Sequence, residues 1–148
     1  MTFEKKILAE MPKCYALGMF EGEDAPSFLA AVEKDGPIRR FTLDGEPLET
    51  VAPGPGGVMT ITQVPGRKDQ FLATRKFFSP NFGGDDAAIA SYTKQADGTW
   101  SEQILCDLPY VHRFGILKAA DGQLWIIACT IKGGAETGVK DDWRTPGA

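Results

Sequence analysis

Short apolar segments separated by Gly, Pro and Asp recur along the chain, and this pattern predicts β-strands. One group of four segments lies at residues 14–20, 27–32, 38–43 and 47–51. A second group of four lies at residues 58–64, 70–77, 88–94 and 99–105. No long segment repeats its apolar residues with the 3.6-residue period of a helix, so we expect helices to be minor. The predicted fold class is therefore all-β, with antiparallel four-stranded sheets.

Asp-Gly pairs stand between the third and fourth predicted strands of each group, at 44–45 and 97–98. A two-residue hairpin requires positive φ, which Asp-Gly adopts at low cost. A third pair, at 121–122, turns a hairpin between strands predicted at 111–118 and 123–131. We interpret the pairs as turns and not as calcium loops, because no DxDxDG-type sequence accompanies them.

Two long stretches of the chain resemble each other without a gap. They are "FEKKILAEMPKCYALGMF" at residues 3–20 and "WSEQILCDLPYVHRFGIL" at residues 100–117, which align Gly18 with Gly115. Four of the 18 positions are identical, and Phe/Trp, Glu/Asp, Met/Leu and Met/Ile exchanges fill much of the rest. The match favours a shared architecture over chance.

A shorter motif appears three times, as "SFLAA", "QFLAT" and "WIIAC". It places Phe28, Phe71 and Ile126 at spacings of 43 and 55 residues. Periods of this size are typical of a four-stranded sheet that repeats around a β-propeller. We therefore expect these three side chains to be buried at equivalent places.

The repeats divide one propeller-like domain, residues 1–148, into blade units at about 14–52, 57–106 and 111–148. Residues 3–10 match the fourth strand of the second unit, so a closure strand is predicted there. Propellers have about four to eight blades, whereas this sequence offers about two and a half. We expect a partial propeller, completed by a homo-oligomer or by the remainder of a longer propeller, because open strand edges recruit partners.

The composition is that of a globular domain, with 43% hydrophobic residues and a net charge of -4. Acidic balance without a run of Lys and Arg argues against nucleic acid as a partner. The first residues contain no continuous apolar stretch, so we expect neither a signal peptide nor a membrane anchor, and a cytoplasmic location. Cys14, Cys106 and Cys129 form no CxxC pair and are expected to be unbridged, buried thiols.

Three motifs carry a family resemblance: "LPYVHRFGIL" at 108–117, "IIACTIK" at 126–132 and "DDWRTPG" at 141–147. With them, almost the whole chain resembles the N-terminal part of bacterial propeller proteins related to the FG-GAP and VCBS repeat group. The Asp-rich calcium loops typical of FG-GAP repeats are absent from this sequence. The chain is also distantly similar to the propeller of aldos-2-ulose dehydratase, a sugar lyase with metal-bound histidines around a central cavity. Only His112 could correspond to one of those histidines.

One face of the predicted sheets collects the unusual residues. Strands alternate in direction. The loops that enter the first strands and the loops that join second to third strands therefore emerge on the same face. The long connections 75–86 and 132–143 lie on this face, and long loops in a compact repeat tend to be functional. The predicted ligand-binding residues are Tyr15, Lys76, Asn81, Arg113 and Trp143.

His112 is the only histidine and begins a predicted innermost strand. There a neutral imidazole can serve as a general base or bind a metal; the alternative is a structural histidine at a strand end. Arg113 is expected to point to the other side of the strand, and to be structural or to engage a neighbouring blade. Asp141 and Asp142 are candidate ligands for a divalent metal, the one cofactor considered, although paired carboxylates also start turns.

Two functions remain open on these grounds. The first is a propeller-type binding or assembly module, whose loops hold a ligand or partner without chemistry. The second is a carbohydrate-active lyase or hydrolase with His112 as base or metal ligand and loop aromatics as a platform for a carbohydrate ligand. The sequence contains no GxSxG, Walker or GxGxxG motif. The first function requires no residue that the sequence lacks, whereas the second requires additional polar residues.

Overall fold

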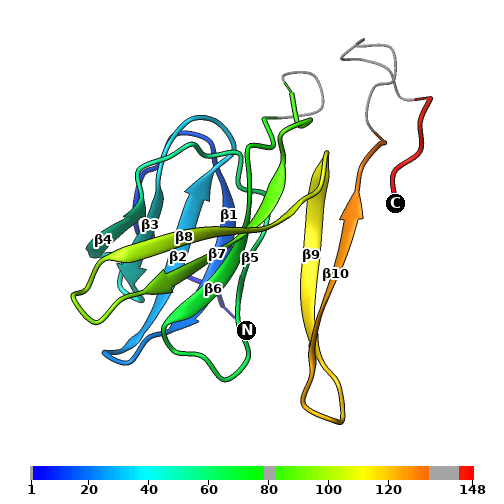
Figure 1. Cartoon of the computed structure of the whole chain (residues 1–148). Coiled ribbons are helices and arrows are strands. Elements are labelled where there is room, and N and C mark those ends of the chain that lie inside the picture. The colour runs from blue at the N-terminus through cyan, green and yellow to red at the C-terminus, as the bar shows by residue number, and fades with distance from the viewer. Residues whose placement is uncertain (1, 79–82, 134–143) are drawn as a thin grey trace.

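The computed structural model describes residues 2–78, 83–133 and 144–148. Within this part, ten strands form three antiparallel sheets (Figure 1) and no residue is helical. The all-β, antiparallel prediction is confirmed. No described segment could cross a membrane as a helix.

The strands follow one another as meanders, so neighbours in sequence are neighbours in each sheet. The first sheet contains β1 (Cys14–Glu21), β2 (Pro26–Val32), β3 (Ile38–Thr42) and β4 (Pro47–Ala52). The second sheet contains β5 (Ile61–Gln63), β6 (Gln70–Arg75), β7 (Ala88–Lys94) and β8 (Trp100–Asp107). The third sheet contains β9 (Val111–Lys118) and β10 (Leu124–Thr130).

One strand differs clearly from its prediction. β5 begins three residues after the predicted start at Val58. The hydroxyl of Thr74 accepts hydrogen bonds from the backbone N–H groups of Met59 and Thr60, at 2.7 and 3.1 Å. A side chain therefore replaces part of the backbone ladder at the entry to the second sheet.

The three Asp-Gly pairs form the same turn. Gly45, Gly98 and Gly122 have φ values of 96°, 85° and 87°. Each glycine N–H donates to a carbonyl three residues earlier, as from Gly98 to Gln95 at 2.9 Å. The predicted positive φ is confirmed at glycine, but the loops contain three residues and not two, because only the glycine is left-handed.

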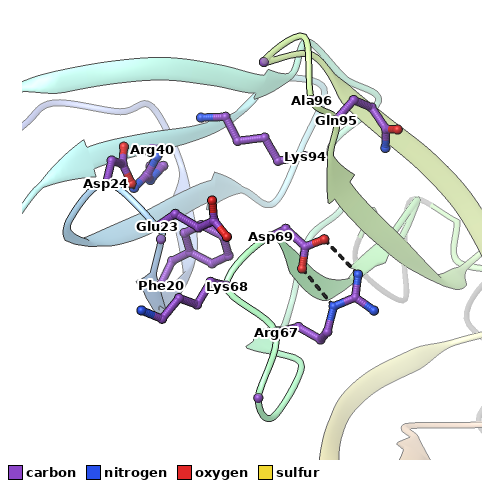
Figure 2. Close-up of a pocket in the computed structure, with 13 residues that line it drawn as sticks. Phe20, Glu23, Asp24, Arg40, Arg67, Lys68, Asp69, Lys94, Gln95 and Ala96 are labelled. Carbon is purple, nitrogen blue, oxygen red and sulfur yellow. Dashed lines mark hydrogen bonds and ion pairs between the residues drawn. The ribbon is translucent and has the colours of Figure 1, made fainter.

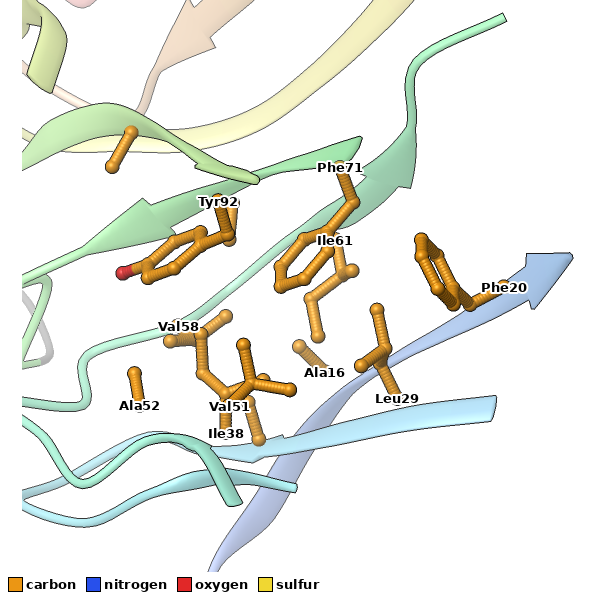
Figure 3. Packing of buried hydrophobic residues seen from close by; sticks show 13 residues of the cluster. Ala16, Phe20, Leu29, Ile38, Val51, Ala52, Val58, Ile61, Phe71 and Tyr92 are labelled. Carbon is orange, nitrogen blue, oxygen red and sulfur yellow. The ribbon is translucent and has the colours of Figure 1, made fainter. Parts of the chain in front are cut away.

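The second sheet lies between the other two and packs on both of its faces. Against the first sheet it buries Phe71, whose ring stacks on Tyr92 at 5.0 Å and meets Phe20 edge-on at 6.0 Å (Figure 3). A separate core, which includes Leu72 and Phe114, joins the second sheet to the third. Each fully buried side chain of this size contributes about 1.5–3 kcal/mol of hydrophobic stabilisation.

The repeated Phe-Leu-Ala motif marks the second strand of each sheet, as its spacing predicted. Its burial does not repeat. Phe71 is fully buried, Phe28 is half-buried and Ile126 is 40% exposed. The prediction of equal burial is wrong. Phe71 is covered by the first sheet, whereas Ile126 stays partly exposed although its partner Ile116 packs toward the second sheet.

The strand predicted at 3–10 is not formed. Residues 2–10 are exposed and contain no strand, since no described edge strand pairs with them. Instead, Leu8 lies against Gly45, and Ile7 borders a groove over the outer face of the first sheet. The three cysteines are free, as expected, but all three are exposed, so their predicted burial is wrong. An apolar strand segment buries a residue only where another sheet covers it.

Candidate functional site

The first strands of the three sheets have similar approaches. A left-handed residue directly precedes β1 and β9, namely Lys13 at 54° and Tyr110 at 59°, and Gly57 at 68° lies four residues before β5. β1 and β9 each contain a β-bulge directly afterwards, at which Tyr15 and His112 have no partner on the neighbouring strand. Bulges re-aim side chains out of the alternating pattern of a strand. The two bulged residues consequently meet, although they are 97 positions apart.

The His112 ring lies between two aromatic side chains. Its Nε2 is 3.4 Å from the Tyr15 hydroxyl, and the two rings are 6.1 Å apart in an edge-on arrangement. The ring of Phe77, which follows β6 and is buried, lies 5.3 Å away at 71°. Side chains from the first sheet, from the third sheet and from the segment after β6 therefore meet at this point.

Arg113 completes the cluster. Its guanidinium donates to the backbone carbonyl of Met59 in the neighbouring sheet and lies 5.4 Å from the centre of the Tyr15 ring. The expectation that Arg113 engages a neighbouring unit is confirmed. We call Tyr15, Phe77, His112 and Arg113 the three-sheet joint, because they link all three sheets.

In the described part of the chain, the His112 imidazole forms no ion pair with a carboxylate. Burial, and secondly the charge of Arg113, lower the pKa of His112 below its usual value. Among the described residues, no three His, Cys, Asp or Glu side chains lie together as a metal site. The described neighbours of His112 are therefore two aromatic rings and a guanidinium.

The other predicted site residues do not join this cluster. Lys76 has φ of 58° and its N–H donates to the carbonyl of Gly56 at 2.9 Å, so its backbone closes the end of β6. Its side chain makes no hydrogen bond or ion pair with the described residues. The remaining predicted residues lie outside the described part of the chain: Asn81, Asp141, Asp142 and Trp143.

A cleft that the sequence did not reveal opens at the opposite ends of the strands, between the first and second sheets (Figure 2). It has a volume of about 740 Å³ and is bordered by the turns after β1, β5 and β7. Its charged lining residues are Glu23, Asp24, Arg40, Arg67, Lys68, Asp69 and Lys94. The short turns around this cleft did not indicate a site in the sequence. The one sequence feature that points to this region is the charge of Arg40 within a strand that also contains apolar residues.

Most charges in the cleft are already paired. Arg40 is only 1% exposed and donates to Asp24, to Glu49 and to Ser27. Its guanidinium holds the pKa of Asp24 well below the usual range.

A second set of contacts joins this group to the second sheet. Glu49 also accepts from Lys94 Nζ and from Trp100 Nε1, both at 2.9 Å. We call Asp24, Arg40, Glu49, Lys94 and Trp100 the inter-sheet network. Its groups stabilise each other across the two sheets, so the charges of Asp24, Arg40 and Lys94 are engaged within the protein.

Comparisons with protein-family models, with curated proteins and with solved structures find no match to this chain. Function is therefore inferred from the joint, the cleft and the faces of the sheets.

We expect the free energy of unfolding to fall between pH 7 and pH 5, and part of this fall to disappear in His112→Gln. The folded state holds the pKa of His112 below its unfolded value of about 6.5. Stabilisation is therefore complete above that value and is lost as pH decreases, because the unfolded chain binds the proton first. Urea denaturation across this pH range measures the effect. Tyr15→Phe, which keeps the ring, should retain the slope; an unchanged slope in His112→Gln would contradict the assignment.

Proposed function

We propose that this chain is a propeller-type assembly and binding module, which docks sheet faces against one another and performs no chemistry at His112. The observation that carries the proposal is an exposed apolar surface on the third sheet. Leu117 pairs with Trp125, and Gly115 pairs with Ile127, so their side chains share one face. Leu117 is 55% exposed, and Trp125 and Ile127 are each 58% exposed. We call these four residues the docking face.

The opposite face of the same hairpin is already in use. Phe114 and Ile116 pack into the core shared with the second sheet. A two-stranded hairpin is only marginally stable by itself, and contiguous apolar surface of this kind marks interaction sites. A partner that covers the docking face would stabilise the hairpin from its second side.

The enzyme alternative has weaker support. A lyase or hydrolase needs an acid–base pair or a metal beside its reacting groups. His112 has two aromatic rings and a guanidinium as its neighbours. A carbohydrate held by the loops 75–86 and 132–143 belongs to our proposal as a ligand of the module, not as a substrate.

The wider assignment rests on the same architecture. Two four-stranded meanders followed by a hairpin are what a partial propeller of the FG-GAP and VCBS-like group would contain. Blade number, ring closure and the cytoplasmic location stay predictions.

We expect dilute protein to bind the apolar fluorescent probe 1-anilinonaphthalene-8-sulfonate, and Ile127→Asp to weaken that binding several-fold. The charge would interrupt the docking face at its centre. Leu43→Asp is the matched control, since Leu43 is also exposed, at 52%, but lies in the turn between β3 and β4. Circular dichroism checks that both variants fold. Equal probe binding by the two variants, or none by the unmodified chain, would overturn the docking function.

A further inference from the structure

We propose that the docking face binds the outer face of the first sheet of a second copy of this chain, in a head-to-tail arrangement. This inference rests on the proposed docking function and names its partner. Two exposed surfaces carry the argument: the docking face of the third sheet and the outer face of the first sheet. Each resembles one side of the interface that the first and second sheets form inside the chain.

The internal interface depends on a close approach of β1 to β5. The first sheet presents Gly18, Phe20 and Leu29 to the second. A Cβ placed on Gly18 would lie 2.9 Å from Ile61 Cγ2. Only glycine therefore leaves room for the Ile61 side chain of the opposing sheet.

The docking face resembles the side of this interface that the first sheet contributes. Gly18 pairs with Leu29 in the first sheet, as Gly115 pairs with Ile127 in the third. Two residues farther along the same strands, Phe20 corresponds to Leu117. A Cβ placed on Gly115, however, would meet no atom within 4 Å. The space that Ile61 fills beside Gly18 is thus open beside Gly115.

The outer face of the first sheet repeats the other side. Leu17 pairs with Ala30 as Ile61 pairs with Ala73, so Leu17 occupies the position of Ile61. Leu17 is 67% exposed.

An aromatic pair repeats on the same face. Phe28 stacks on Phe41 at 5.2 Å and 14°, as Phe71 stacks on Tyr92 at 5.0 Å and 13°. The outer face of the first sheet therefore carries the side chains that fit the docking face of another copy.

Residues 6–11 of the same chain lie over part of this outer face. They leave a groove of about 360 Å³ above Leu17, Phe28 and Phe41. Ile7 remains 69% exposed and Leu8 40% exposed, so the segment covers the aromatic pair incompletely. The second copy displaces residues 6–11 when it binds. This displacement lowers the affinity between the two copies but does not change how their two faces fit.

A head-to-tail contact uses two different faces, so it closes into a ring when the rotation permits. Two copies would supply six sheets, within the range of about four to eight blades in propellers. We therefore expect a closed dimer with two equal interfaces.

The cysteines provide the test. Val58 N–H donates to the carbonyl of Val32 across the internal interface at 3.2 Å, next to Ala31. By strand register, Cys129 in the third sheet corresponds to Ala31 in the first sheet. Cys14 corresponds to Val58, because each of these two residues directly follows a residue with left-handed φ. Head-to-tail docking thus brings Cys129 close to Cys14 of the second copy.

The experiment is mild oxidation of the full chain carrying Cys106→Ser, followed by denaturing electrophoresis without reductant. We expect a cross-linked dimer that is lost in Cys14→Ser and also in Cys129→Ser, and a sedimenting mass of twice 16.0 kDa. Gly115→Val should weaken association at least about tenfold, since each tenfold loss corresponds to about 1.4 kcal/mol of contact. It should leave the monomer folded, because the added side chain meets open space.

The outcomes separate the two proposals. A cross-link that survives when only one of the two cysteines is present would indicate a symmetric contact and overturn the head-to-tail arrangement. A monomer at all concentrations that still binds the apolar probe at the docking face would overturn the second copy as partner, yet leave the docking function standing. A monomer that binds no probe would overturn both.

Discussion

Replacement of Arg40 by Met is expected to lower the free energy of unfolding by about 3 kcal/mol, the lower end of the range for breaking a buried ion pair. Arg40 is 1% exposed and lies 5.2 Å from the centre of the Phe20 ring. Met retains the packing but removes the donors that satisfy Glu49 and Ser27. Asp24 is 58% exposed and can regain water, so the cost stays below the maximum.

Arg39→Met is the matched control, since Arg39 lies in the same strand but is exposed. It removes the same charge, and its expected effect is within about 0.5 kcal/mol. Urea denaturation followed by circular dichroism at constant pH and salt compares the two variants. Similar losses in both would show that the inter-sheet network contributes nothing beyond net charge.

Phe71→Ala should lower the free energy of unfolding by about 3–5 kcal/mol, as expected for a phenylalanine removed from a closed core. Phe71 is fully buried, and its ring contacts Tyr92, Phe20 and Trp100. The contact with Phe20 crosses to the first sheet, and Phe71 belongs to the core that the two sheets share, so the cavity would open at their interface.

Phe28→Ala provides the comparison at the equivalent position of the first sheet. Phe28 is half-buried, and its ring stacks on the ring of Phe41. We expect about half the loss seen for Phe71→Ala, measured in dilute protein by the same denaturation experiment. Equal losses for the two variants would mean that the outer face of the first sheet is covered to the same extent as its inner face.

Strand positions and turns could be predicted from the sequence because both depend on neighbours along the chain. β7 and β9 have the predicted bounds, and Gly45, Gly98 and Gly122 supply the predicted positive φ. Alternation of apolar residues and the freedom of glycine act over a few residues, so tertiary contacts did not alter them.

The candidate site was predicted only in part. His112 and Tyr15 were both expected on one face, but the β-bulges that bring their rings together cannot be recognised from alternation alone. The inter-sheet network was missed, because Arg40 meets carboxylates from two separate turns and strands, and Glu49 meets Lys94 and Trp100 from another sheet.

By itself, then, the sequence determined the all-β class, most strand positions and the Asp-Gly turns. The tertiary structure decided which repeated residues are buried: Phe71 lies between two sheets, whereas Phe28 and Ile126 each lie in an end sheet. It also left Cys14 and Cys129 exposed and residues 3–10 without a strand. The physical reason is that backbone preference acts locally, whereas burial requires a second surface contributed by residues far away in the chain.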